Sequence, residues 1–251
     1  MSSQLAALAL ALIGAVALTI YGIGQRRKKP KGTGLVPAFG SLANEVGRVA
    51  EEGATIHVAL GSGGLLDENG LTSIAALQGL SALTELSAAY ETPPFITTGD
   101  PTLFLIADNQ LRDAYARLGN LRNYKSGLVR YTAPSPMLYA AMAATLSFDE
   151  PVGTTIILGA FDQEASLLTS AAVTNGEKLF GGATSAVGLA TLYSDIGEDQ
   201  LVVGEKMFAG GAEVTGRSAF WASLSVEDLL RWLVVAGILV AACASLLGLG
   251  G

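Results

Sequence analysis

The sequence predicts a parallel α/β domain of the Rossmann-like type, with helices on both faces of its sheet, flanked by two transmembrane helices. Three observations lead to this prediction. Six short β-rich runs alternate with helical runs in the middle of the chain, long apolar runs lie at both ends, and a cluster of cations follows the first apolar run. Half of the 251 residues are hydrophobic, so we expect the apolar excess to be concentrated in the end segments.

The first apolar run extends from Leu5 to Ile23. At a rise of 1.5 Å per residue, a helix of this length crosses the roughly 30 Å hydrocarbon core of a bilayer. The alternative is a cleaved signal peptide, which has cations before a shorter apolar run. Because residues 1–4 carry no cationic side chain, we expect an uncleaved transmembrane helix in residues 1–24.

Five of the fifteen basic residues stand within one window of six, directly after this run. They are Arg26, Arg27, Lys28, Lys29 and Lys31. Because such cations stay on the cytoplasmic side, they put the N-terminus outside and the following domain inside. Residues 25–34 are therefore predicted to form a basic juxtamembrane linker, which can also bind anionic lipid headgroups.

The second apolar run, Leu233 to Leu249, is the centre of a second predicted transmembrane helix in residues 224–251. Arg231 and Trp232 precede it, at the position expected for the membrane interface. Both apolar runs carry small residues at every fourth position, which lets helices pack closely. We expect a protein of the bacterial inner membrane with both termini outside and a cytoplasmic domain formed by residues 35–223.

Within residues 35–223, short β-rich runs each end in a small residue, and a polar residue and a helical run follow. Strands that alternate with helices in this way predict a parallel sheet. A helix, Ser41 to Glu52, is predicted before the first strand, with Ser41 as its N-cap. The six predicted strands are Thr55–Leu60, Phe95–Thr98, Leu128–Thr132, Thr154–Leu158, Lys178–Phe180 and Leu201–Val203.

Leucine or isoleucine recurs at every third position from Leu71 to Leu86. An apolar stripe with this spacing drifts around a helix and covers a wide arc. We expect a helix that is buried on most of its surface. The alternative is that part of the arc contacts another subunit.

The charge of the domain excludes one class of partner. Residues 35–223 hold nine Lys and Arg against twenty Asp and Glu, a net charge of about −11. Nucleic-acid binding needs clustered cations on the folded surface, so we expect no nucleic-acid partner. The sequence has one cysteine, Cys243, and one histidine, His57. We therefore expect no metal, and the sequence does not indicate a cofactor.

Parallel α/β sheets bind ligands beyond the carboxyl ends of their strands, where the strand order reverses. The loops that follow the predicted strands therefore contain the candidate ligand-binding residues. The glycine-rich loop after the first strand suggests a nucleotide site, but Leu66 replaces the third glycine of that motif and the second strand is not followed by an acidic ribose ligand. The alternative is a tight turn. The candidate residues are Gly61, Ser62, Gly63, Gly64, Thr98, Asp100, Ser135 and Asp162.

Several of these candidates have a structural explanation. Asp100 and Ser135 each precede a proline, the pattern of an N-cap followed by proline at the first helical position, and Asp162 is interpreted as a similar cap. His57 lies within a predicted strand and is expected to be buried with a hydrogen-bond partner. The sequence contains no recognisable catalytic motif, so we assign no catalytic residue and favour a protein that is not an enzyme.

Taken together, the loops resemble those of an uncharacterised bacterial family, a domain of unknown function with membrane-anchored, Rossmann-like members. The resemblance covers nearly the whole chain and implies no activity. It rests on five segments: His57–Leu65, Phe95–Pro101 with T-G-D-P, Ala133–Ala140 with A-P-S-P-x-x-Y-A, Gly159–Phe161, and Val203–Gly211 with G-E-x-M-F-A-x-G.

Two classes of function remain. In the first, which we favour, the domain is an interaction or assembly module that forms a homo-oligomer or joins a larger membrane complex. In the second, it binds a small ligand or nucleotide, or acts as an enzyme, at the carboxyl ends of its strands.

Overall fold

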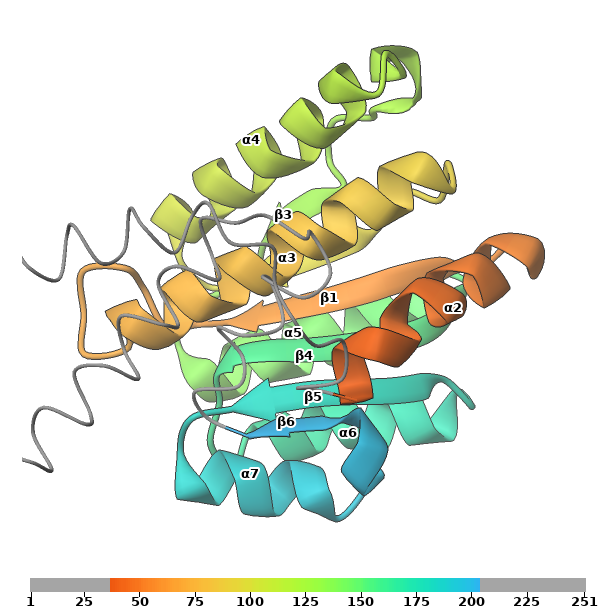
Figure 1. Ribbon diagram of the computed structural model, residues 1–251. Coiled ribbons are helices and arrows are strands. Elements are labelled where there is room, and N and C mark those ends of the chain that lie inside the picture. Colours follow the sequence, from red (N-terminus) through yellow and green to blue (C-terminus); the bar gives the residue numbers. More distant parts are fainter. Residues whose placement is uncertain (1–36, 204–251) are drawn as a thin grey trace, which may run out of the picture. The chain divides into compact units, whose positions relative to one another are not determined.

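The computed structural model of the protein describes residues 37–203, which form a six-stranded parallel sheet between two layers of helices (Figure 1). All six predicted strands are present, in the order β3-β2-β1-β4-β5-β6. This is the doubly wound order of Rossmann-like domains, so the predicted α/β class is confirmed. The strands are β1 Thr55–Gly61, β2 Phe95–Thr98, β3 Val129–Tyr131, β4 Val152–Ala160, β5 Lys178–Ala183 and β6 Leu201–Val203.

The helices cover both faces of the sheet. Helices α2, α3 and α4 pack together on one face, and α5, α6 and α7 pack together on the other (Figure 1). The chain moves outward in opposite directions from β1 and from β4, and right-handed connections then put the two sets of helices on opposite faces. The helices are α2 Pro37–Glu51, α3 Gly70–Ala89, α4 Pro101–Arg117, α5 Pro136–Asp149, α6 Ala165–Thr174 and α7 Ala186–Tyr193, with short 3-10 turns at Leu121–Asn123 and Glu198–Gln200.

The predicted membrane segments lie outside the described residues. They comprise residues 1–24, the basic linker 25–34, and residues 224–251 with Arg231 and Trp232. Between residues 37 and 203, no helix is both long and apolar enough to cross a membrane.

The core lies on both sides of the two central strands. Six of the seven residues of β1 are buried, because helices cover this strand from both faces. On the α5 and α6 side, Tyr139, Ile157, Phe161 and Leu168 form the centre of one apolar cluster.

Helix α2 begins earlier than predicted. Pro37 is its first residue, a position that suits proline because the first amide of a helix has no partner within the helix. Ser41 is therefore not the N-cap, and its hydroxyl donates to the carbonyl of Ala38 at 3.1 Å. The apolar side of the helix is as predicted: Leu42, Val46 and Val49 are all buried.

The leucine-rich helix α3 is buried on most of its surface, as predicted. Thirteen of its twenty residues are buried, among them Leu77, Leu80 and Leu83. Two large apolar residues near its start are exceptions: Leu71 is 74% exposed and Ile74 is 42% exposed.

Strand β5 continues beyond its predicted end at Phe180. Gly181 and Gly182 pair with β4 on one side and β6 on the other, so they are inside the strand rather than in the loop after it. A Cβ atom at Gly181 would lie 2.7 Å from Cδ1 of Ile196, so the glycine allows the chain that follows α7 to pack against the sheet. The loop at this strand end therefore begins at Thr184.

Candidate functional site

A cavity of about 240 Å³ lies where the strand order reverses, at the carboxyl ends of β1 and β4. Four loops line it, and they follow β1, β3, β4 and β5. This is the position at which parallel α/β sheets bind ligands. The lining residues are Ser62, Gly63, Asp67, Asn69, Pro134, Pro136, Ala160, Phe161, Asp162, Glu164, Thr184 and Ser185.

The β1 loop begins with a sharp turn at Gly61. Gly61 has a φ of +81°, and a Cβ atom there would lie 2.9 Å from the carbonyl oxygen of Ala160. Glycine is therefore required for β1 and β4 to remain close while the chain turns. The Gly61 amide donates to the Tyr139 hydroxyl at 3.2 Å, and its carbonyl accepts from the Gly99 amide at 2.9 Å. Both contacts hold the β1 loop in position.

The amides of this loop are already paired with a carboxylate. Asp67 Oδ2 accepts from the Gly64 amide at 2.7 Å, and Asp67 Oδ1 accepts from the Asn69 amide at 2.7 Å. In dinucleotide-binding domains the corresponding amides, together with the start of the following helix, bind a pyrophosphate. Here the Asp67 carboxylate takes up two of these donors and brings a negative charge, which opposes the binding of a phosphate.

The lining of the cavity is acidic. It contains three carboxylates, Asp67, Asp162 and Glu164, and the described residues that line it include no Lys, Arg or His. Glu164 is 6% exposed, and its Oε1 accepts from the Asp162 amide at 3.0 Å. Asp162 Oδ1 lies 2.6 Å from the Ser185 hydroxyl. The cavity therefore favours a positively charged ligand over an anion.

Three of the eight predicted residues line the cavity: Ser62, Gly63 and Asp162. Gly61 and Gly64 shape the same loop through the contacts described above. Asp162 is not the helix cap that the sequence suggested, because Glu164 is the residue before α6. Residues 161–164 form a turn between the end of β4 and the start of α6, and in this turn the Asp162 carboxylate contacts the Ser185 hydroxyl.

The other three predicted residues surround the cavity without lining it. Thr98 is buried, and its hydroxyl accepts from the Asp100 amide at 3.2 Å. Asp100 is the N-cap of α4, as predicted, and accepts from the Leu103 amide at 2.8 Å. Ser135 precedes α5 as predicted, but its side chain makes no capping hydrogen bond. Its neighbours Pro134 and Pro136 form the wall of the cavity.

Five further polar residues line the cavity that the sequence pattern did not indicate: Asp67, Asn69, Glu164, Thr184 and Ser185. A signal for Glu164 was present, because it stands two residues after Asp162 in a loop already singled out. Thr184 and Ser185 were missed because β5 was predicted to end too early. Thr184 is joined to Thr72 at the start of α3 by a 2.9 Å hydrogen bond between their hydroxyls.

His57 is the centre of a buried polar chain beneath the cavity. Its Nε2 lies 2.9 Å from Thr97 Oγ1, and its Nδ1 lies 2.9 Å from Ser147 Oγ. Thr97 Oγ1 lies 3.0 Å from the Tyr139 hydroxyl, which accepts from Gly61. Burial, with a smaller effect of the Arg130 charge, lowers the pKa of His57 to about 3. The imidazole is thus neutral and structural, as expected, and the chain supports the glycine loop from below.

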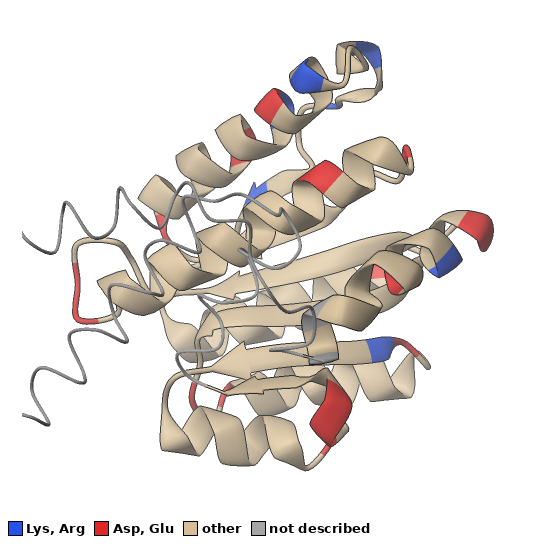
Figure 2. Cartoon of the chain, viewed as in Figure 1, with Lys and Arg blue, Asp and Glu red and all other residues tan. Residues whose placement is uncertain are grey.

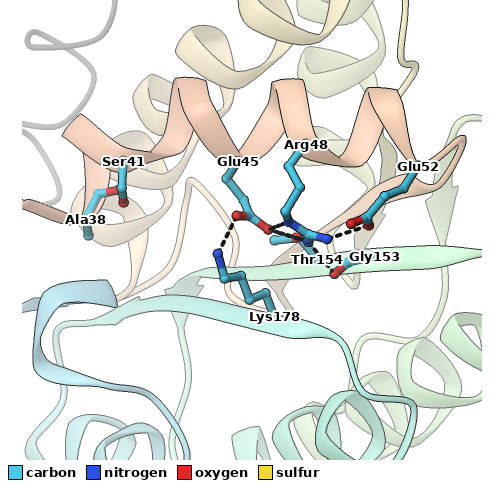
Figure 3. Close-up of polar contacts among 8 residues, drawn as sticks. All are labelled: Ala38, Ser41, Glu45, Arg48, Glu52, Gly153, Thr154 and Lys178. Carbon is cyan, nitrogen blue, oxygen red and sulfur yellow. Dashed lines mark hydrogen bonds and ion pairs between the residues drawn. The ribbon is translucent and has the colours of Figure 1, made fainter.

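A second polar cluster fastens α2 to the opposite end of the sheet (Figure 3). Glu45 is buried and accepts from Lys178 Nζ at 2.7 Å, Arg48 Nη2 at 2.6 Å and Thr154 Oγ1 at 2.5 Å. Burial by itself raises the pKa of Glu45, but these hydrogen bonds outweigh it and lower the pKa to about 2. All polar groups of Glu45 are occupied, so we assign this cluster to stability rather than to ligand binding.

The cavity is suited to binding more than to catalysis. Ser185 contacts a carboxylate, but its hydroxyl also accepts from the Gly188 amide at 2.9 Å and so caps α7. The neutral His57 lies beneath the cavity and does not line it. The described lining thus provides charge and hydrogen-bond acceptors, and the Ser185 hydroxyl, although it contacts the Asp162 carboxylate, is engaged in capping α7.

The fold and this cavity define the class of protein: a Rossmann-like α/β domain with an acidic pocket at the reversal of its strand order. The chain belongs to the family described as "Domain of unknown function (DUF6754)", which matches residues 2–249. A comparison with curated proteins found no match, and a comparison with solved structures also found none.

Proposed function

We propose that the protein is a membrane-anchored scaffold whose cytoplasmic domain assembles with further copies of itself. The observation that carries this proposal is the composition of the α5–α6–α7 face, by which we mean the outer surface of these three helices. The three helices contain one charged residue, Asp149, at the end of α5. By contrast, α2, α3 and α4 carry eight, as Figure 2 illustrates.

Large apolar side chains are exposed along this face. Exposed apolar residues are common on proteins, but a group of them on helices that carry almost no charge is typical of an interaction site. Taking 1.5 Å per residue and about 10 Å between neighbouring helices, the face covers roughly 500 Å² in projection, which is close to the lower limit of about 500 Å² per partner for a specific interface. Its exposed apolar residues are Met137, Leu138, Met142, Phe148, Leu167, Val173, Val187 and Tyr193.

A second copy is the occupant that the charges favour. Two strongly acidic domains repel each other, so close association is favoured through a face with few like charges. A bilayer surface is less suitable, because peripheral helices bind anionic lipids through Lys and Arg, which this face lacks. The two predicted membrane helices support assembly independently, through the small residues that recur along both.

Mass measurement in mild detergent tests the proposal. The full chain is expected to be a multimer by light scattering, and Met142→Glu combined with Val173→Glu is expected to shift it toward the monomer. Leu105→Glu is the matched control, since Leu105 is 60% exposed on α4, on the other face. A monomeric wild type would refute the proposal. A multimer that survives the double substitution would show that this face is not the contact.

The cavity favours a second, compatible function, the binding of a small ligand. An enzyme is less well supported, because the Ser185 hydroxyl that contacts the Asp162 carboxylate in the lining also caps α7. The acidic lining and the internal Asp67 contacts also make a nucleotide the less suitable ligand.

A further inference from the structure

We infer that the turn after α4 docks on an anionic lipid surface by binding the phosphate groups of the lipid headgroups. This turn, residues 117–125, is called the basic tip below. It leads from the end of α4 toward the start of β3, so it lies at the amino ends of the strands, on the opposite edge of the sheet from the cavity. The inference rests on one part of the proposed function, the membrane anchor, and does not depend on self-association.

Positive charge in the described part of the chain is concentrated around the basic tip. Five of the seven Lys and Arg of residues 37–203 lie between positions 112 and 130. Figure 2 shows them gathered at the end of α4 and in the turn that follows it. Residues 114–128 contain three cations and no Asp or Glu, whereas residues 35–223 as a whole carry about −11. An anionic surface therefore attracts this end of the domain and repels the rest.

Two cations of the basic tip are available to a ligand. Arg122 and Lys125 are both exposed, and no ion pair or hydrogen bond between described residues involves either side chain. Arg117 differs, because its Nη2 lies 3.0 Å from Glu85 Oε1. Lipid phosphate groups would supply Arg122 and Lys125 with both a hydrogen-bond acceptor and the opposite charge.

Exposed leucines beside these cations favour a bilayer over other anionic partners. Leu118 is 54% exposed and Leu121 is 45% exposed. Segments that bind at a membrane interface combine Lys and Arg with apolar side chains that enter the boundary between headgroups and acyl chains. A nucleic acid would leave the leucines in water, and two available cations provide few phosphate contacts. A bilayer uses both kinds of side chain, and an anchored domain remains close to it.

The basic tip is held in one shape by contacts with the elements beside it. The Tyr124 hydroxyl donates to Asp108 Oδ1 at 2.6 Å, and the Tyr124 ring centroid lies 6.5 Å from that of Tyr115. Asn120 Nδ2 donates to Glu91 Oε1 at 3.0 Å, which ties the turn to the end of α3. Because the turn is already ordered, docking does not incur the entropy cost of ordering a loop.

Fluorescence of the full chain reconstituted in lipid vesicles tests the inference. An environment-sensitive fluorophore is attached at Asn123→Cys, an exposed position of the basic tip, in a chain that also carries Cys243→Ser. Its emission should shift to shorter wavelength when phosphatidylcholine vesicles are replaced by phosphatidylcholine and phosphatidylglycerol at about two to one. Added salt should reverse the shift, because the contact is between charges. The same label at Glu68→Cys, on the opposite edge of the sheet, should show no shift.

A variant and a matched control separate the position of the charges from their sum. Arg122→Gln combined with Lys125→Gln should abolish the emission shift, and both residues are exposed, so the domain should still fold. Thr102→Glu combined with Gln163→Glu lowers the net charge by the same amount, at exposed positions on the cavity side of the sheet. This control should retain the shift.

Three outcomes would overturn the inference. They are equal emission in the two kinds of vesicle, a shift that the double glutamine variant retains, and a shift in phosphatidylcholine alone that grows with protein density. The second would assign the effect to the cations of residues 26–31, and the third to contact with another copy. Extraction of the chain by alkaline carbonate would refute the membrane anchor and this inference together, whereas a retained chain without the shift would refute this inference alone.

Discussion

At the scale of single residues, His57 links the stability of the domain to pH. It is fully buried, it is the sole histidine of the sequence, and its pKa is lowered from 6.5 to about 3. Its ring stacks on Phe95 at 4.6 Å, and both of its nitrogens have hydrogen-bond partners. A neutral imidazole satisfies both contacts because one nitrogen donates and the other accepts. Protonation would place an unpaired charge in the core.

The first prediction concerns how the free energy of unfolding depends on pH through His57. Below pH 6.5 the unfolded chain binds a proton at His57 that the folded chain does not. The free energy of unfolding therefore decreases as the pH is lowered, until the pH reaches the pKa of His57 in the folded chain, about 3. Between pH 7.5 and pH 5 the loss should be about 2 kcal/mol. Denaturant unfolding of the full chain measures it. His57→Gln, which does not titrate, should remove this slope, and an equal slope in both proteins would contradict the prediction.

At the scale of elements, a polar residue followed by proline correctly predicted where two helices begin. It also predicted the capping hydrogen bond where the polar side chain accepts from an amide of the helix that follows it. Asp100 and Pro101 are a predicted N-cap and first helical residue, and the structure confirms both. Ser135 and Pro136 follow the same pattern, but there the serine does not cap. The cap of α4 therefore explains Asp100 without a ligand.

The second prediction follows from this cap. Asp100→Ala should lower the free energy of unfolding by about 1 kcal/mol, because the Leu103 amide loses its acceptor. Asp100→Asn should cost much less, since asparagine is a comparable N-cap residue. Denaturant unfolding of the two variants checks the difference. Equal losses in both would show that the charge of Asp100, rather than its capping bond, is what matters.

At the scale of the whole molecule, charge separates the parts of the chain. The basic cluster at residues 26–31 precedes a domain with a net charge of about −11, whose charges are concentrated away from α5, α6 and α7. We propose that the cluster holds the domain on the cytoplasmic side and close to the bilayer, and that the uncharged helices remain available for assembly. The inner-membrane location and the two spans stay predictions from the sequence.

The third prediction concerns this topology. A reporter that is active outside the cytoplasm should be active when fused after residue 251 and inactive when fused after residue 34, because two spans would return the chain to the outside. A fluorescent protein that folds in the cytoplasm should give the opposite pattern. Replacing the five cations of residues 26–31 with glutamine should weaken the orientation. A C-terminal fusion that behaves as cytoplasmic would refute the two-span arrangement.

The sequence by itself determined the α/β class, the positions of all six strands and the burial of His57. These features depend on local patterns, namely apolar runs, small residues at strand ends and helical spacing, which act within a few residues of the chain. It also indicated Ser62, Gly63 and Asp162, because residues at the carboxyl ends of parallel strands gather at one edge of the sheet.

Only the tertiary structure decided the strand order, and with it the cavity. The pairing of β1 with β4 brings Ser62 together with Asp162 and Ser185, which are about a hundred residues further along the chain. In the same way, Glu45 meets Lys178 across 133 residues. Such contacts depend on which strands pair and how far each one extends. Those outcomes are set by packing across the whole sheet, which no local pattern of residues specifies.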